Sequence, residues 1–119
     1  MDIDVTQSNG VAVVSPHGDL DMATVHDVRR ALASLLDRGQ SRLLIDLNGV
    51  AYIDSSGMGT LIAAMKQARA AGGDVRLCGL QDDVRAIFEM TRVVQAMSIH
   101  PTRQEIGRAS CRERVYVLV

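Results

Sequence analysis

The sequence predicts a single α/β domain with a mixed β-sheet, in which an antiparallel N-terminal pair of strands is followed by parallel βαβ units packed with helices. Three observations predict this fold class. A chain of 119 residues that is 47% hydrophobic can bury one core. Two β-rich runs near its start flank Asn9-Gly10, a strong hairpin signal. Helical segments then alternate with apolar strand-like runs, which is the pattern of right-handed crossovers between parallel strands.

The N-terminal hairpin is expected at residues 3–6 and 11–15, on either side of the Asn9-Gly10 turn. Pro16 and Gly18 end its second strand, because proline cannot donate a hydrogen bond to the ladder. A helix follows, and its apolar residues recur at helical spacing. They are Val25, Val28, Leu32, Leu35 and Leu36.

Capping residues and glycines mark the ends of the helices. Asp21 or Thr24 could cap the first helix, and Gly39 stops it. The second helix stops at Gly72-Gly73, and Asp82 starts the third. The remaining strands, which we expect to run parallel, are residues 42–47, 75–80 and 96–99. The first of them is an almost continuous apolar run, so it is expected to be buried on both faces.

Composition and charge argue against several classes of function. Thirteen basic and 14 acidic residues give a net charge of -1, so no basic field attracts nucleic acid or an anionic membrane. No apolar run is long enough to span a bilayer. The N-terminus contains Asp2 and Asp4 and has neither the basic nor the apolar region of a signal peptide. We therefore expect a cytoplasmic protein without membrane insertion. The histidines and cysteines lack metal-ligand spacing, so we expect neither a metal nor another cofactor.

The candidate functional site is a tight acidic turn, Asp54-Ser55-Ser56-Gly57-Met58-Gly59, that follows the strand at residues 42–47. A helix begins immediately after this turn, because apolar residues recur at i, i+3, i+4 and i+7. These residues are Met58, Leu61, Ile62 and Met65. Asp54, Ser55 and Ser56 therefore lie at a helix N-terminus, where free N–H groups and the helix dipole favour a cap, an anion or a phosphate.

Each residue of this turn also has a purely structural interpretation. Serine is a favoured cap, so spacing alone favours capping over a functional role for Ser55 and Ser56. Asp54 is either the N-cap or a carboxylate that orients a neighbouring hydroxyl, and both can hold. Asp21 could simply cap the first helix. Met58 has the spacing of a core residue, although the turn leaves it near the candidate site.

Three segments of the chain together form a family signature: Gly18-Asp19-Leu20-Asp21, Leu43-Leu44-Ile45-Asp46-Leu47 and Asp54-Ser55-Ser56-Gly57-Met58-Gly59. In this order they resemble the STAS domain and, more narrowly, the bacterial anti-sigma factor antagonists of the sporulation and general-stress type. The resemblance covers residues 3–105, and it agrees with the order of strands and helices derived above. We therefore expect a STAS domain at residues 1–105.

The resemblance implies a protein-binding switch and not an enzyme. In that family the first serine after the turn aspartate accepts phosphate, and here this serine is Ser55. The kinase is the anti-sigma factor itself, which uses ATP. The unphosphorylated antagonist binds it and frees the sigma factor, phosphorylation blocks this binding, and a phosphatase reverses it. In the family, the aspartate that matches Asp21 lies close to the phosphoacceptor. The expected partner-binding residues are Asp21, Asp54, Ser56, Gly57, Met58 and Gly59.

Two other kinds of protein remain as alternatives. STAS domains also serve as subunits of lipid-transport ATPase complexes and of stress-signalling assemblies, but the related transporter subunits often lack the phosphorylatable serine. Serine hydrolases also place a serine at a strand-to-helix turn, after a glycine. Here Ile53 and Asp54 occupy the places before the serines, and His100 is the only histidine that follows the turn. Hydrolysis is therefore the less favoured alternative.

Residues 106–119 form an atypical tail. Thr102 and Glu105 have capping-box spacing, which predicts a final helix, but the residues that follow lack an apolar face and place Gly107 in its first turn. Residues 105–115 look like the translation of a sequencing-library adapter, so our hypothesis is a read-through that replaced a native final helix. The rival hypothesis is a natural basic tail that contacts a partner or acidic lipid. Re-sequencing of the locus decides between them.

Overall fold

The fold is seen in a computed structural model, which describes residues 1–90, 97–100 and 115–118. The elements in chain order are β1 (Asp2–Ser8), β2 (Val11–His17), α1 (Val25–Asp37), β3 (Arg42–Asp46), α2 (Ser55–Ala70), β4 (Asp74–Cys78), α3 (Asp82–Met90), β5 (Met97–His100) and β6 (Val115–Leu118). Within these ranges, no helix has both the length and the apolar character needed to cross a membrane.

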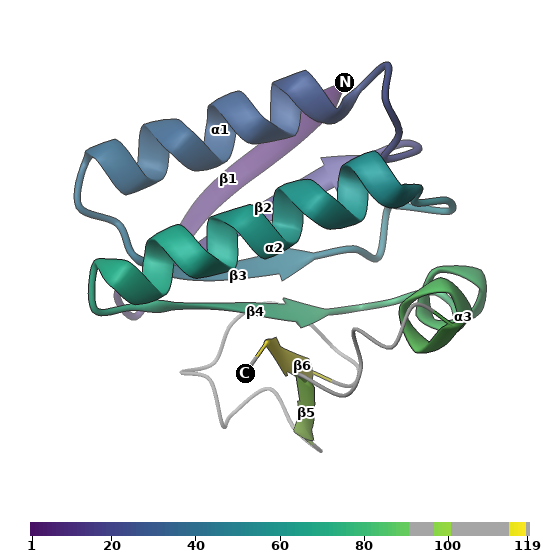
Figure 1. Cartoon of the computed structure of the whole chain (residues 1–119). Coiled ribbons are helices and arrows are strands. Elements are labelled where there is room, and N and C mark those ends of the chain that lie inside the picture. Colours follow the sequence, from purple (N-terminus) through teal and green to yellow (C-terminus); the bar gives the residue numbers. More distant parts are fainter. Residues whose placement is uncertain (91–96, 101–114, 119) are drawn as a thin grey trace.

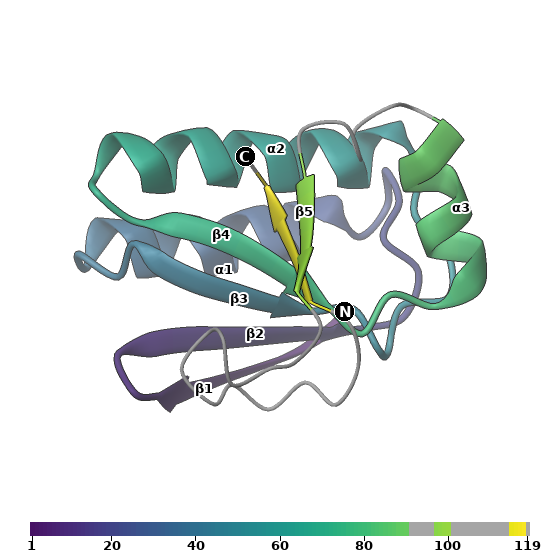
Figure 2. The ribbon, with the colours of Figure 1, turned by 90° about the horizontal axis from the view of Figure 1, so that it is seen from below.

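A mixed sheet organises the described strands, in the order β1-β2-β3-β4-β6-β5. β1 and β2 pair antiparallel, whereas β2 pairs parallel with β3 and β3 pairs parallel with β4. These pairings confirm the mixed sheet that the sequence predicts. Figure 1 shows α1 and α2 side by side over one face of the sheet, and Figure 2 shows the same layering from below. The third helix, α3, lies at one end of the sheet, beyond β4 (Figure 1).

The N-terminal hairpin forms as predicted because both residues of its turn adopt positive φ. Asn9 and Gly10 have φ values of 53° and 79°, as a type I′ turn requires. The second strand runs past its predicted end, to His17. Pro16 is tolerated there because β3 pairs only with residues 12–14, so the proline lies beyond the parallel ladder.

Glycines end the two long helices, as predicted. Gly39 has a φ of 83° after the end of α1, and the Gln40 N–H donates to the carbonyl oxygen of Leu35 at 2.9 Å. Gly72 has a φ of 87° and ends α2 in the same way. This arrangement is the Schellman motif, which supplies donors to helix carbonyls that would otherwise lack them.

The main core lies between the sheet and the two long helices. Alternate strand residues face α1 and α2, and each is at most 2% exposed: Val14, Leu43, Ile45, Val75 and Leu77. The other face of the same strands contributes a second, smaller cluster of Val13, Leu44 and Cys78. β3 is therefore buried on both faces, which confirms the prediction.

The last strands of the sheet differ from the prediction. The sequence predicts a parallel strand at residues 96–99, and β5 does form at Met97–His100. However, β6 lies between β4 and β5 and pairs antiparallel with both. β5 therefore runs in the direction of β4 without pairing with it. β6 (Val115–Leu118) belongs to the atypical tail at residues 106–119, and its β-branched and aromatic residues favour a strand. The final helix expected after Thr102 lies outside the described residues.

Candidate functional site

The candidate site lies at the edge of the sheet where the parallel strands end. Residues 18–24, here called the first loop, follow β2, and residues 47–54, the second loop, follow β3 and lead into α2. Figure 1 shows the arrowheads of β2, β3 and β4 pointing toward the end of the molecule at which α2 begins. In open α/β sheets, ligands bind outside the carboxyl ends of the strands.

Backbone hydrogen bonds join the two loops. The Leu20 N–H donates to the carbonyl oxygen of Tyr52 at 2.8 Å, and the Asp54 N–H donates to that of Leu20 at 3.1 Å. These bonds form a parallel bridge between Leu20 and Ile53, whose side chains are buried. Asp21 and Asp54 directly follow the two bridged residues in the chain. The structure therefore brings the acidic loop and the acidic turn together.

Asp54 caps α2 and fastens its start to the first loop. Its backbone is extended, with φ of -110° and ψ of -174°, and its Oδ1 accepts a hydrogen bond from the Gly57 N–H at 3.0 Å. Its Oδ2 accepts a hydrogen bond from the Met22 N–H at 3.2 Å. The capping interpretation is confirmed. The bond to Oδ2 also links the start of α2 to the first loop, which the sequence does not reveal.

Replacement of Asp54 by alanine is expected to lower the free energy of unfolding by about 1–2 kcal/mol, because the cap is lost together with the acceptor for the first loop. Asp54→Asn should lose less, since its side-chain carbonyl still accepts one hydrogen bond. Urea unfolding followed by circular dichroism measures both variants. An Asp54→Ala variant as stable as the wild type would contradict this account of the helix start.

The Asp21 carboxylate orders the chain that leads into α1. Its Oδ1 accepts hydrogen bonds from the N–H groups of Ala23 at 3.0 Å and Thr24 at 3.2 Å. Thr24 occupies the N-cap position without a side-chain cap bond to the helix, and its hydroxyl donates to the Asp19 carbonyl oxygen at 2.7 Å. Asp21 is only partly buried, so its carboxylate also contributes to the surface.

Ser55 carries the accessible hydroxyl of the site. It is exposed at the first position of α2, and within the described residues no hydrogen bond engages its side chain. Ser56 is partly buried, and its carbonyl oxygen accepts a hydrogen bond from the Thr60 hydroxyl at 3.0 Å. The Arg29 guanidinium of α1 donates to the same hydroxyl at 3.4 Å. Of the two serines, Ser55 therefore offers the more accessible oxygen, next to the free N–H groups of a helix start.

The turn glycines differ in what their surroundings require. A Cβ on Gly57 would lie 2.6 Å from the carbonyl oxygen of Leu20, so only glycine allows α2 to approach the first loop this closely. A Cβ on Gly59 would meet nothing within 4 Å, and this residue is exposed. The side chain of Met58 is 5% exposed and belongs to the core, so the helix directs it away from the surface near which the sequence analysis places it.

The surface around Ser55 is acidic. The two loops and the first turn of α2, residues 18–24 and 47–58, contain no lysine, arginine or histidine. Their ionisable side chains other than Tyr52 are three carboxylates: Asp19, Asp21 and Asp54. A negatively charged group added to Ser55 would therefore meet like charge from both loops, and the helix start would attract it. The Arg29 guanidinium of α1, which donates to Thr60 at 3.4 Å, is a cation that the structure places on this part of α2.

Within the described residues, no side chain is hydrogen-bonded to Ser55 as a base. The imidazole Nε2 of His17 lies 3.0 Å from Oδ2 of Asp4, and no hydrogen bond links His17 or His26 to Ser55 within the described chain. The same residues contain no group of three or more His, Cys, Asp or Glu side chains that could hold a metal ion. The arrangement presents a hydroxyl that another protein can modify, and it lacks the hydrogen-bonded base of a serine nucleophile.

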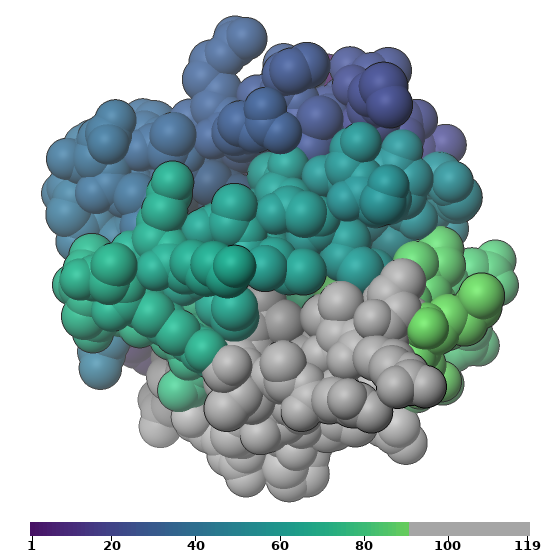
Figure 3. Space-filling view, viewed as in Figure 1, coloured from purple at the N-terminus to yellow at the C-terminus, as the bar shows by residue number. Residues whose placement is uncertain are grey.

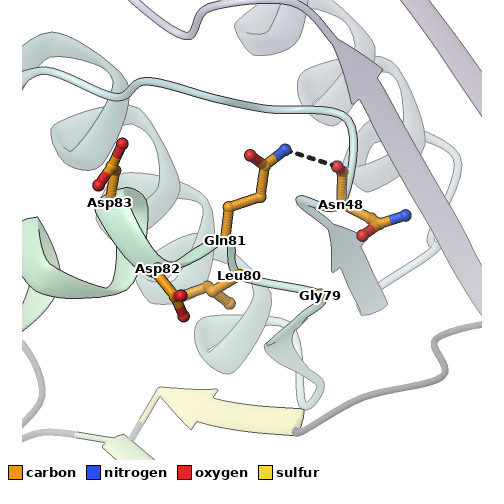
Figure 4. A pocket seen from close by; sticks show the side chains of 6 residues that line it. All are labelled: Asn48, Gly79, Leu80, Gln81, Asp82 and Asp83. Carbon is orange, nitrogen blue, oxygen red and sulfur yellow. Dashed lines mark hydrogen bonds between the residues drawn. The ribbon is translucent and has the colours of Figure 1, made fainter.

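A polar pocket opens at the same edge of the sheet (Figure 4). It has a volume of about 490 Å³ and is lined by Asn48, Gly79, Leu80, Gln81, Asp82 and Asp83. The Gln81 Nε2 donates to the carbonyl oxygen of Asn48 at 2.8 Å, which ties the start of α3 to the second loop. The sequence analysis names only Asp82 among these residues, as the start of the third helix, and predicts no pocket here. The available signal was their position directly after two neighbouring parallel strands.

The family model described as STAS domain matches residues 2–106. BtrV of Bordetella bronchiseptica, a candidate anti-sigma factor antagonist, is 26% identical over 92% of this chain and 94% of its own. The anti-sigma-B factor antagonist of Staphylococcus aureus is 24% identical over 84% of this chain and 93% of its own.

Solved structures share the fold. An anti-sigma factor antagonist from Mycobacterium paratuberculosis superposes with a TM-score of 0.73 at 24% identity, over 88% of this chain and 89% of its own. The anti-sigma factor antagonist SpoIIAA in its unphosphorylated form gives a TM-score of 0.62 at 20% identity, over 75% and 83% of the two chains. The phosphorylated form of SpoIIAA from Bacillus gives the same score over 76% and 83%. At these identities the likeness shows the fold alone.

Proposed function

The chain belongs to the STAS domain family, and from this premise we propose that the protein is an anti-sigma factor antagonist. The observation that carries the proposal is the exposed Ser55 hydroxyl at the first position of α2, beside the Asp54 cap and the first loop. The names of the two curated relatives support it, since this chain matches most of each.

In this proposal the unphosphorylated protein binds an anti-sigma factor that is also a serine kinase, and binding releases the sigma factor. The contact surface consists of the turn and loop residues that are exposed or partly exposed: Asp21, Asp54, Ser55, Ser56 and Gly59. Gly57 and Met58 are buried, so they shape this surface from beneath. The protein acts by binding, and the catalytic groups belong to its partner.

Phosphorylation of Ser55 switches the binding off through charge. The phosphate adds about -1.5 to -2 charges to a surface that already carries Asp21 and Asp54. A kinase that modifies Ser55 must bring the γ-phosphate of ATP to its hydroxyl, so a phosphoserine would face the nucleotide phosphates of the same partner. A penalty of about 3 kcal/mol lowers the affinity by roughly a hundredfold or more.

The fold can carry this phosphate without rearrangement. Ser55 is exposed, so the added group requires no movement of core atoms. The first N–H groups of α2 have no acceptor within the helix, and the helix dipole favours an anion at this end. An exposed phosphoserine also remains accessible to a phosphatase, which resets the switch.

Incubation of the purified protein with ATP and, in turn, each anti-sigma factor ATPase of its host tests the proposal. We expect one of these kinases to form a complex with the protein and to add a single phosphate at Ser55, detected by intact-mass analysis and peptide mapping. The complex should be lost after phosphorylation. Absence of both binding and phosphate transfer with every such kinase would contradict the antagonist function.

Esterase and phosphatase assays on generic substrates provide the control for an enzymatic role. We expect no turnover that depends on Ser55, because within the described residues its hydroxyl has no hydrogen-bonded base. Turnover that disappears in Ser55→Ala would instead favour a serine hydrolase.

A further inference from the structure

Two exposed apolar side chains lie in the loops that adjoin Ser55. Among the described residues, the large hydrophobic side chains that are well exposed are Val5, Met22, Tyr52 and Met90. Met22, in the first loop, is 71% exposed, and Tyr52, in the second loop, is 48% exposed. Neither belongs to the core, so packing within the described fold does not explain their apolar character.

Hydrogen bonds hold the backbone of both residues in place. The Tyr52 carbonyl oxygen accepts from the Leu20 N–H at 2.8 Å, and the Met22 N–H donates to Oδ2 of Asp54 at 3.2 Å. Leu20 is fully buried and therefore anchors the first loop on the core. Met22 and Tyr52 are thus held by ordered backbone in the two loops that adjoin the start of α2, which lowers the entropy lost when a partner binds them.

We propose that Met22 and Tyr52 are apolar anchors that enter an apolar socket on the anti-sigma factor when Ser55 is unphosphorylated. This inference rests on the proposed function and names the side chains that provide its affinity. Aromatic residues and methionine are enriched in interface cores, and a few such side chains contribute most of the binding energy. Ser55 then supplies the switch, and its two apolar neighbours supply the affinity.

The charge of the surface identifies the kind of partner. Asp19, Asp21 and Asp54 lie in the same loops as the anchors, and neither loop contains a basic side chain. A second copy of this chain would place these carboxylates against each other, and nucleic acid or an acidic membrane would also be repelled. The socket should therefore have basic side chains at its rim, and the association rate should fall as salt concentration rises.

Met22→Gln tests the anchor because glutamine keeps a side chain of similar length and removes its apolar end. The matched control is Met90→Gln, since Met90 is 82% exposed but lies on α3, outside both loops. Titration calorimetry with the anti-sigma factor ATPase identified by the phosphorylation assay should show a Kd raised at least about tenfold for Met22→Gln. Met90→Gln should change it by less than about twofold, and both variants should keep the wild-type denaturant midpoint.

The outcomes separate this inference from the proposed function. Equal Kd values for Met22→Gln and the wild type would overturn the anchor and leave the antagonist function standing. Failure of the wild type to bind any anti-sigma factor ATPase would overturn both. Concentration-dependent self-association that Met22→Gln abolishes would overturn the choice of partner and point to a second copy of the chain. Ser55→Ala should bind normally without accepting phosphate, so affinity and phosphorylation are read independently.

Discussion

Ser55→Ala is expected to abolish phosphate transfer by the cognate anti-sigma factor kinase while preserving the complex with it. The substitution removes one exposed hydroxyl and leaves the Asp54 cap and the core in place. Alanine is well accepted in a helix, so the free energy of unfolding should change little. Intact-mass analysis after incubation with ATP and the kinase measures the phosphate. Undiminished phosphorylation of the alanine variant would show that another residue is the acceptor.

Ser56→Ala is the matched control for this experiment. Ser56 is the next residue of the helix, carries the same hydroxyl and is partly buried. We expect this variant to accept one phosphate as the wild type does, because Ser55 remains intact. If Ser56→Ala lost phosphate transfer and Ser55→Ala kept it, Ser56 would be the phosphate acceptor.

Ser55→Glu should fold normally and bind the anti-sigma factor at least about tenfold more weakly than the wild type, a loss of about 1.4 kcal/mol. A carboxylate at the first turn of a helix is tolerated by the helix dipole, so stability should be retained. The same charge would join Asp21 and Asp54 on the contact surface. Wild-type affinity in Ser55→Glu, measured by calorimetry, would refute a switch that works through charge.

The second large effect is expected from Gly57→Ala, and Gly59→Ala provides its comparison. Gly57→Ala should destabilise the fold by about 1–3 kcal/mol or more, because the new Cβ would overlap backbone. It would lie 2.6 Å from the Leu20 carbonyl oxygen, an atom that accepts the Asp54 N–H and cannot move freely. Urea unfolding measures the loss. Wild-type stability of Gly57→Ala would mean that the first loop can move away from α2 at little cost.

Gly59→Ala should have the opposite effect on stability. Gly59 lies inside α2, and an added Cβ would meet nothing within 4 Å. Alanine there should raise the free energy of unfolding by about 0.5–1 kcal/mol, because glycine is the poorer helix former. If the partner approaches this backbone closely, the same methyl group should weaken binding by about tenfold.

The combined readout at Gly59 distinguishes a structural role from a role in binding. A variant that is more stable and binds more weakly would show that glycine is retained for the partner, since the fold does not require it. A variant that is more stable and binds as the wild type does would remove Gly59 from the contact surface. The affinity of Ser55→Ala for the partner is measured in parallel, because this variant is expected to bind as the wild type does.

The turns and helix ends could be predicted from the sequence because they depend on residues close in the chain. Asn9 and Gly10 adopt the positive φ values of their turn, and Gly39 and Gly72 end the two long helices. The helix that begins at Ser55, and its capping by Asp54, follow from local spacing and side-chain chemistry in the same way.

The order of the last strands could not be predicted locally. β6 enters the sheet between β4 and β5, and no pattern within residues 96–99 indicates which strand will lie next to them. Strand pairing is a contact between distant parts of the chain, so it depends on what the rest of the fold leaves uncovered. The pocket formed by Asn48 and the start of α3 arises in the same way, from two strand ends that only the sheet brings together.

At the site, the residues close in the chain predict a serine- and aspartate-bearing helix start after a buried strand, together with an acidic loop that matches the family pattern. Which of these groups face outward depends on how the strands, helices and loops pack together. Packing buries Met58 in the core and leaves Met22 exposed next to the turn. It leaves no room for a Cβ at position 57, whereas a Cβ at position 59 meets nothing within 4 Å. The physical reason is that exposure and close approach are set by elements packed from elsewhere in the chain, whereas capping and turn conformation are set by neighbouring residues.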